Sequence, residues 1–460
     1  MAQGVGIVQS LIIVKLLSTG DFGLVGLVTA IGAAVGVYQN LGISSGSTRE
    51  ISAALSRKEA FKIFTGSLFV RYVISLPLVI GLILTASYLA NDYYKQPSIA
   101  NPLRIFALVL FVQALQSVLT SVIQGLKKFK FLFVFQVVAA FLSISIYIPF
   151  LMKYSFMGYF YAMLIFTVIH TLIMSIYVFY LFKENIELPT LSEFKSIFKA
   201  VFSIGIFVYA TKIIFTFWQK IGPLELGRIV NEELLGIFAF ALLVSSKVLV
   251  ISDAVTDVTL PVMTDIYTKS KKLFRIKFLE SNSKAFLLIT FTAVMLVISK
   301  KEIFFIADLI FQSIGKSSIS SRYASSFTLM DPLILAFWAY SQMNLLKSGV
   351  AVPIQNLKGT LISYIIMISS TFIIYQFLKT NPLMGIALSM GIGALLGYIT
   401  QIFLLKPKTG FYPISLQDIE YLGFSMIVLA SYYLQLTIYV SVPIFVFITY
   451  LSYAKNIRQK

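Results

Sequence analysis

The sequence predicts an all-α membrane protein of about fourteen transmembrane helices. Of its 460 residues, 58% are hydrophobic and 12% are charged, and this charged fraction is about half that of an ordinary soluble protein. The mean hydropathy is +0.88. Long apolar runs, each followed by a short polar break, continue to the end of the chain. A soluble fold of this length cannot bury so much apolar surface, so lipid takes the place of water as the solvent.

The apolar runs place the individual spans. We expect them near residues 4–17, 22–44, 64–90, 103–125, 131–152, 157–182, 200–219, 234–260, 285–299, 303–314, 326–346, 360–378, 383–405, 420–437 and 440–454. The first run is shorter than the roughly 20 residues of a full span, so we expect the start of that helix to precede the printed sequence. Lys300, Lys301 and Glu302 interrupt the region 285–314, which therefore predicts one span and an outer re-entrant or interfacial piece.

The distribution of lysine and arginine predicts the orientation. With the N-terminus inside, the inner loops hold about twice as many of these residues as the outer loops, so both termini are predicted to be cytoplasmic. We expect a multi-pass protein of the cytoplasmic (inner) membrane. The same bias accounts for the net charge of +18 without a nucleic acid, and it favours membrane lipids with anionic headgroups as partners. Two basic, amphipathic inner loops, 191–199 and 269–278, predict either helices in the headgroup layer or solvated loops.

The composition leaves little material for catalysis. There is no cysteine and one histidine, His170, which excludes disulfides and cysteine metal sites and argues against histidine triads. No Walker sequence is present, and Gly391-x-Gly393 lies within a span, so no nucleotide site is expected. No large exposed loop displays the carboxylate pair of a glycosyltransferase or ligase. We therefore expect no catalytic residue, no metal and no cofactor, and the chain is predicted not to be an enzyme.

The second half of the chain repeats motifs of the first half in the same order. The matched segments are 16–25 with 229–238, 124–127 with 355–358, and 156–158 with 383–385. Their offsets are 213, 231 and 227 residues, and the first match aligns Gly23 with Gly236. An even number of spans separates the copies, so both keep the same sidedness. This predicts two parallel, pseudo-symmetric bundles with a substrate path between them, an arrangement typical of transporters.

The repeat also predicts the domain boundaries. We expect an N-terminal helical bundle at 1–182, a cytoplasmic linker at 183–199 and a C-terminal bundle at 200–405. A final transmembrane helix pair and a cytoplasmic tail would follow at 406–460.

Three cations lie well inside predicted spans, away from the span ends: Arg71, Lys212 and Lys247. A charge at the bilayer centre costs roughly 2.5–3.5 kcal/mol on insertion scales, so such residues usually face a cavity or a partner. One interpretation is a water-filled cleft in which the three cations bind an anionic phosphate or acidic sugar. The other is that Arg71 reaches the inner interface and that one of the lysines pairs with an aspartate.

Two carboxylates, Asp253 and Asp257, share one face of the span at 234–260 because they are four residues apart. Either could take up a proton or pair with a cation, which would couple transport to an ion gradient. Asp257 lies near the inner end of its helix, where a purely structural role is the main alternative.

Uncharged polar side chains also lie within the spans. Gln113, Gln116, Gln342 and Asn344 are expected to bond between helices or to line the path and bind sugar hydroxyls. His170 is expected to be a hydrogen-bonded packing residue, with a proton relay as the alternative.

The opening of the chain resembles that of the Wzx-type oligosaccharide flippases. The resemblance is carried by residues 15–24, by Asn40-Leu41-Gly42-Ile43 and by Arg49-Glu50. Gln124-Gly125-Leu126-Lys127-Lys128-Phe129 is similar to the next landmark of that family, and Gly236 with Pro261 to the start of its second half. The short N-terminus departs from the family and puts its first helix in doubt.

The resemblance implies the fold of the multidrug and lipid II exporters, in which two bundles form a V-shaped, alternating-access cleft. It also implies transport of lipid-linked sugar diphosphates from the cytoplasmic to the outer leaflet, with the polysaccharide polymerase machinery as a partner. Arg71, Lys212 and Lys247 match its cationic cavity by membrane location and not by a motif.

Two alternative functions remain at this point. A drug/cation antiporter of the same superfamily would carry acidic residues in its cleft without the surplus of lysine and arginine. A membrane-embedded polysaccharide polymerase or ligase would need a large outer loop with reactive groups, whereas the longest outer segment, near 300–326, is mostly apolar and serine-rich.

Overall fold

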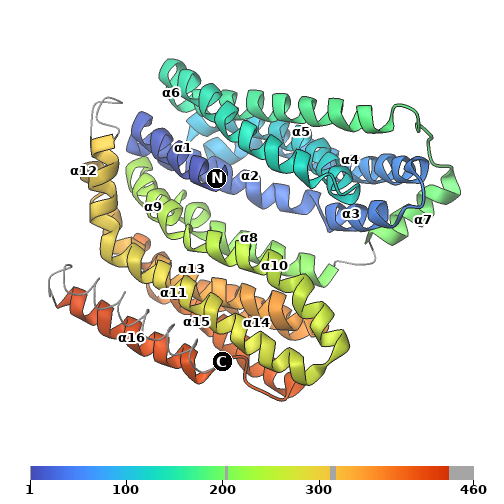
Figure 1. Cartoon of the computed structure of the whole chain (residues 1–460). Helices are drawn as coiled ribbons and strands as arrows, with labels where there is room; N and C mark the ends of the chain where they lie inside the picture. The colour runs from blue at the N-terminus through green and yellow to red at the C-terminus, as the bar shows by residue number, and fades with distance from the viewer. Residues whose placement is uncertain (1, 203–205, 311–317, 435–460) are drawn as a thin grey trace. The chain divides into compact units, whose positions relative to one another are not determined.

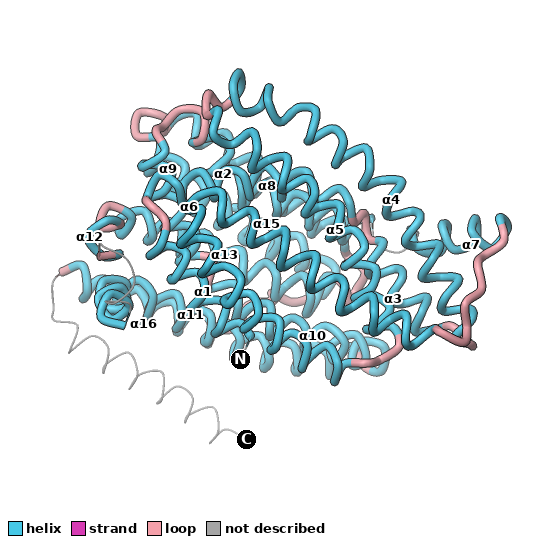
Figure 2. The backbone as a smooth tube through the Cα atoms, turned by 90° about the horizontal axis from the view of Figure 1, so that it is seen from above, coloured by secondary structure: helices cyan, strands magenta, loops and turns pink. Residues whose placement is uncertain are grey.

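The computed structural model describes residues 2–202, 206–310 and 318–434. Within these ranges every regular element is a helix, and no strand occurs (Figures 1 and 2). The α-helices are α1 (Ala2–Leu16), α2 (Thr19–Gly36), α3 (Ile43–Ala53), α4 (Arg57–Tyr88), α5 (Ala100–Gly125), α6 (Phe129–Phe182), α7 (Leu191–Phe202), α8 (Ile206–Leu226), α9 (Glu232–Ser245), α10 (Val248–Lys269), α11 (Lys271–Ile310), α12 (Ile319–Arg322), α13 (Ser326–Leu346), α14 (Leu357–Phe377), α15 (Pro382–Thr409) and α16 (Leu416–Tyr433). Short 3-10 and π turns are η1 (Val37–Gln39), η2 (Leu89–Tyr93), η3 (Pro97–Ile99) and η4 (Lys347–Ala351).

The predicted all-α, polytopic membrane fold is confirmed. Eight helical segments of the described chain are long and apolar enough to cross a membrane: Thr19–Gln39, Arg57–Tyr93, Pro97–Gly125, Phe129–Phe182, Glu232–Lys269, Lys271–Ile310, Leu357–Phe377 and Pro382–Thr409. The longest, α6, has a non-helical residue at Ser155 (φ 48°), between the predicted spans 131–152 and 157–182. The predicted span 440–454 lies outside the described residues.

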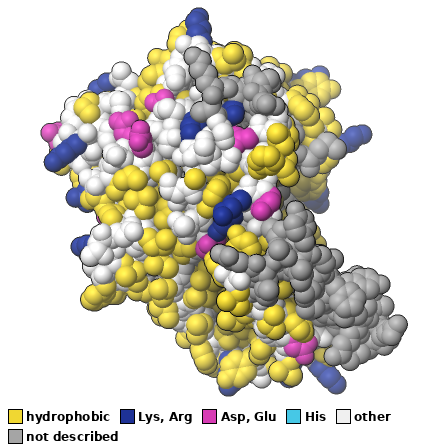
Figure 3. Space-filling model, turned by 90° about the vertical axis from the view of Figure 1, so that its left-hand side faces the viewer, with side chains coloured by type: hydrophobic (Ala, Val, Ile, Leu, Met, Phe, Trp, Pro, Cys, Tyr) yellow, Lys and Arg dark blue, Asp and Glu magenta, His cyan; other side chains and the backbone are white. Residues whose placement is uncertain are grey.

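The surface has the chemistry of a lipid-facing protein. Hydrophobic side chains cover much of the face in Figure 3. Large apolar side chains such as Leu84, Phe133 and Phe377 are 76%, 67% and 81% exposed. Water would not tolerate such extensive apolar exposure, whereas hydrocarbon does.

The described chain divides into two compact units by its internal contacts. The first unit comprises Met1–Ala239 with Ile310–Arg322, and the second comprises Phe240–Leu309 with Tyr323–Lys460. The first unit thus includes α8, whereas the sequence places a boundary at 183–199. The predicted bundle boundaries stay a prediction.

The predicted span 22–44 is a broken helix. α2 begins at Ser18, whose side chain accepts a hydrogen bond from the backbone N of Asp21 at 3.0 Å. The helix passes through η1 and ends before Leu41 and Gly42, which have φ of 37° and 84°. Glycine adopts this left-handed conformation at no steric cost, and α3 then begins at Ile43. The break places the N-terminus of α3 inside the first unit.

The repeated glycines contact each other. A Cβ on Gly23 of α2 would lie 2.5 Å from the backbone N of Gly236 on α9 and equally close to the carbonyl O of Glu232. Two helices approach this closely only where neither carries a side chain. The residues that the repeat aligns are therefore also packing partners within the first unit.

The basic segment 191–199 forms the helix α7, which packs on α3 and α4. Lys62 of α4 pairs with Glu187 at 2.7 Å and with Glu193 of α7 at 2.8 Å. Phe194 packs edge-on against Phe69 with ring centroids 5.2 Å apart. These contacts fasten the segment after α6 to the first unit, and we call them the α7 latch.

The α7 latch is expected to release in acid. Hydrogen bonds from Lys62 and Thr190 lower the pKa of Glu193 to about 2, and Lys62 also lowers the pKa of Glu187. A depressed carboxylate pKa stabilises docking above the ordinary value near 4.5, and this stabilisation is lost as the pH falls from there toward 2. A fluorophore on Leu191→Cys, the sole cysteine of that variant, would report the release.

The same fluorophore in a Lys62→Met background is the control. We expect it to report an undocked α7 already at neutral pH, with little further change in acid. Helical circular dichroism must stay constant over the range. A release that follows the same pH profile with and without Lys62 would contradict the latch.

Lys300 lies inside a continuous helix. The expectation of a span plus a separate outer piece at 285–314 is wrong for the part that the structure describes, because α11 runs unbroken to Ile310. Lys300 is 5% exposed and donates to the carboxylate of Asp331 on α13 and to the carbonyl O of Phe327, the latter at 2.9 Å. Tyr433 donates to the other oxygen of Asp331 at 2.8 Å. Lys300 suggests an interrupted span when the sequence is considered alone. In the structure Asp331, which lies far along the chain, neutralises its charge.

Removal of one member of this pair is expected to destabilise the protein strongly. Lys300→Met leaves Asp331 without its cation, and an uncompensated buried charge costs about 3–5 kcal/mol. The double variant Lys300→Met/Asp331→Leu is expected to unfold within about 1 kcal/mol of the wild type, because neither charge remains. Denaturant unfolding in detergent measures the cycle. Additive single effects would show that the two side chains do not interact.

Candidate anion-binding pocket

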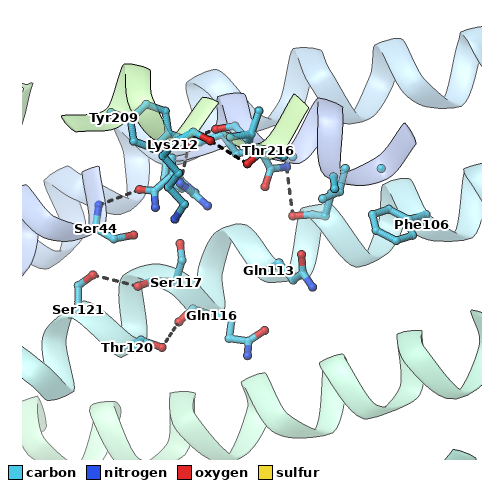
Figure 4. A pocket seen from close by; sticks show the side chains of 18 of the residues that line it. Ser44, Phe106, Gln113, Gln116, Ser117, Thr120, Ser121, Tyr209, Lys212 and Thr216 are labelled. Carbon is cyan, nitrogen blue, oxygen red and sulfur yellow. Dashed lines mark hydrogen bonds between the residues drawn. The ribbon is translucent and has the colours of Figure 1, made fainter. Parts of the chain in front are cut away.

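A pocket of about 690 Å³ lies within the first unit (Figure 4). Side chains of α2, η1, α3, α4, α5 and α8 line it. It is within the usual size range of a small-molecule site. Two of the three predicted cations, Arg71 and Lys212, line it, as do Gln113 and Gln116.

Arg71 of α4 is 4% exposed. Its Nη1 donates to the carbonyl O of Gln39 at 2.5 Å, which ties the guanidinium to the broken segment between α2 and α3. Its Nε is buried and has no hydrogen-bond partner among the described residues. The side chain is therefore enclosed by the first unit, and it retains an unused donor.

α8 contributes a second and a third cation. Tyr209, Lys212, Thr216, Gln219 and Lys220 line the pocket, and their spacing puts them on one face of the helix. Tyr209 donates to the carbonyl O of Val37, which anchors α8 to the end of α2. Lys220, which the sequence places in an outer loop, is a pocket residue instead.

The charges in this pocket have one sign. Arg71, Lys212 and Lys220 line it, and no aspartate or glutamate is among its described lining residues. Positive charges gathered in a low-dielectric wall make the electrostatic potential of the pocket positive. Such a pocket attracts an anion and repels a cation.

α5 supplies a neutral wall. Its pocket-lining polar residues follow the helical period: Gln113, Gln116, Ser117, Thr120, Ser121 and Gln124. Ser117, Thr120 and Ser121 donate to backbone carbonyls one turn earlier, at 2.9–3.0 Å. Each hydroxyl oxygen therefore keeps its lone pairs for accepting hydrogen bonds from a ligand. In Figure 4 this wall lies across the pocket from Tyr209 and Lys212.

His170 stands behind the neutral wall. Its Nδ1 lies 2.9 Å from Nε2 of Gln116, and its ring packs against Phe135 and Phe166. The hydrogen bond fixes the amide of Gln116, so His170 has contacts that suit the packing role expected of it.

The remaining predicted site residues lie in the second unit. Lys247 precedes α10 and is half-buried. Asn344 of α13 donates to Oδ1 of Asp253 at 3.2 Å and to Oγ of Ser252 at 3.4 Å. Gln342 is buried, and its Nε2 has no partner within the described part of the chain. The side chain of Asp257 lies outside the described residues.

Several residues that line the pocket are not predicted from the sequence. Gln39, Ser44 and Tyr209 are unremarkable in sequence. Gln39 and Ser44 flank the helix break at Gly42, and Tyr209 lines the pocket because α8 packs against α2 and η1. For α8 a signal is present, since Lys212, Thr216 and Lys220 recur at intervals of four. The assignment of Lys220 to an outer loop hides this spacing.

Comparison with known proteins shows which family and which fold this chain resembles. Residues 12–307 match a family described as "Polysaccharide biosynthesis protein". A search of curated proteins finds no match. The structure is similar to the lipid II flippase MurJ in an inward closed conformation, with a TM-score of 0.74 and 16% identity over 100% of this chain and 97% of that one. An inward-facing multidrug resistance MATE family transporter of the MOP superfamily matches with a TM-score of 0.68 and 15% identity, over 89% and 95%.

These likenesses confirm the resemblance to polysaccharide exporters that the sequence motifs indicate. The long apolar helices and the transporter neighbours together make this a multi-pass membrane protein. The chain belongs to the polysaccharide biosynthesis protein family and has the fold of the MOP-superfamily transporters.

Proposed function

We propose that this protein is a flippase for polyprenyl-diphosphate-linked oligosaccharide. It moves the lipid-linked sugar from the cytoplasmic to the outer leaflet of the inner membrane for cell-surface polysaccharide synthesis, including O-antigen or lipopolysaccharide. Both termini are cytoplasmic in this proposal, and the polymerase machinery receives the product. The observation that carries it is a single pocket lined both by the cations Arg71, Lys212 and Lys220 and by the neutral polar wall of α5.

The two walls match the two polar parts of such a substrate. A diphosphate diester carries two negative charges, which the three cations attract strongly because the surroundings are apolar. Sugar hydroxyls are both donors and acceptors, and the amides and hydroxyls of α5 offer both. The polyprenyl chain stays in the lipid, where it loses no hydrophobic stabilisation.

An ion gradient supplies the driving force in this proposal. Asp253 and Asp257 of α10 are the candidate coupling residues, and Lys247 is a further cation of the transport path. Asn344, through its hydrogen bond to Asp253, would respond to protonation or cation binding at that carboxylate. Lys247, Asp253 and Asn344 are not among the described residues that line the pocket, so their part in transport is separable from substrate binding.

Transport by the purified protein tests the proposal. Proteoliposomes would contain a fluorescent polyprenyl-diphosphate oligosaccharide, and its protection from an external reagent would be followed with and without a proton or sodium gradient. Protein-dependent translocation supports the flippase. Failure of translocation, together with gradient-driven uptake of a lipophilic cation, would instead support the drug/cation antiporter.

A further inference from the structure

The break between α2 and α3 creates a corner of the pocket with unused donors. α3 has 11 residues and begins after Gly42, so its positive end faces the same region as Asn40 and Ser44, which both line the pocket. The N-cap residue of α3 is Gly42, and the carboxamide Oδ1 of Asn40 accepts from the backbone N of Ser44 at 3.0 Å. Figure 4 shows Ser44 on the side of the pocket that carries Lys212 and Tyr209.

Two buried donors in this corner lack partners among the described residues: Oγ of Ser44 and Nε of Arg71. Only 4% of the Arg71 side chain is exposed. Buried polar groups are almost always hydrogen-bonded, so two unsatisfied donors beside one helix N-terminus point to a missing acceptor. A tetrahedral oxyanion suits this arrangement, because it accepts several hydrogen bonds and is stabilised by the helix end.

We propose that one phosphate group of the substrate binds in the corner formed by Arg71, Ser44 and the N-terminus of α3. This inference rests on the proposed function and locates the diphosphate within it. Arg71 neutralises the first phosphate and donates from Nε, and Ser44 donates its hydroxyl hydrogen. The second phosphate then lies toward Lys212, and the sugar lies against α5.

Substitution of Asn40 separates this role from a structural one. Aspartate has the same length and keeps an oxygen that can accept from the backbone N of Ser44, so Asn40→Asp keeps this contact with α3 while it adds a negative charge to the corner. A phosphate would be repelled, whereas an uncharged ligand would not. Asn40→Ser is the control, because its hydroxyl oxygen can also accept a hydrogen bond but carries no charge.

The experiment measures the affinity of each variant, in lipid nanodiscs, for a short-chain polyprenyl-diphosphate disaccharide. We expect Asn40→Asp to weaken binding by at least about tenfold and Asn40→Ser to change it less than about threefold. Ser44→Ala is expected to weaken binding, whereas Ser45→Ala is not, because Ser45 is exposed and donates to the carbonyl O of Gly42. An uncharged alkyl disaccharide should bind all variants alike.

Competition identifies the source of the phosphate. Inorganic diphosphate is expected to compete with the probe, whereas phosphatidylglycerol in the nanodisc should not displace it. Displacement by phosphatidylglycerol would overturn the inference in favour of a general phospholipid headgroup site. Equal binding by Asn40→Asp and Asn40→Ser would also overturn it and leave the flippase proposal standing. If the wild type binds no diphosphate probe at all, the proposed function itself fails.

Discussion

Alanine at Lys212 is expected to abolish translocation of a diphosphate-linked oligosaccharide while expression and folding stay intact. Lys212 lines the pocket from α8 and is exposed within its unit, so its truncation removes charge without opening a buried core. Loss of one charge partner in a site of this kind costs tenfold or more in affinity, roughly 2–5 kcal/mol. Initial rates in the proteoliposome assay measure the effect.

Two matched variants sharpen this experiment. Lys58→Ala removes an exposed cation of the first unit outside the pocket and is expected to leave transport unchanged. Lys247→Ala removes the third predicted cation, in the second unit, and is also expected to abolish transport. Full activity of both Lys212→Ala and Lys247→Ala would remove the cationic mechanism. Loss in Lys212→Ala alone would confine it to the pocket of the first unit.

Alanine at Gly23 is expected to cause a large loss of stability, although it adds only a single methyl group. The added Cβ meets backbone atoms of Glu232 and Gly236, which cannot rotate away as a side chain does. Overpacking of this kind costs typically about 1–3 kcal/mol, and rigid neighbours place Gly23 at the upper end. Denaturant unfolding in detergent measures it.

Gly81→Ala is the control for Gly23→Ala. Gly81 lies in α4, and a Cβ there would meet nothing within 4 Å. Because alanine is the better helix former, this change is expected to be neutral or to stabilise by up to about 1 kcal/mol. Equal stabilities of the two variants would show that the contact between Gly23 and Gly236 is not close in the folded protein.

Local sequence signals sufficed for much of this fold. The apolar runs locate most of the helices, because burial in lipid demands about 20 apolar residues in a row. Ser18 stands directly before a helix whose first turn is acidic, and its side chain caps α2. The polar face of α5 is also readable, since Gln113, Gln116 and Ser117 already follow the helical period.

Other features depended on partners far away in the chain. Lys300 predicts an interrupted span because a charge is unfavourable in hydrocarbon. In the structure Asp331, 31 residues later, neutralises that charge and the helix continues. Lys220 moves from a predicted loop into the pocket for a similar reason, since only the packing of α8 against α2 and η1 decides what its face meets.

By itself, the sequence determined the membrane class, most of the helices, the internal repeat and the surplus of intramembrane cations. These properties follow from composition and period, which act over one or two helical turns. The tertiary structure alone decided that Arg71 and Lys212, distant in sequence, line one pocket with Ser44 and the start of α3. Charges in hydrocarbon must meet partners or cavities, and which ones they meet is set by helix packing rather than by any local pattern.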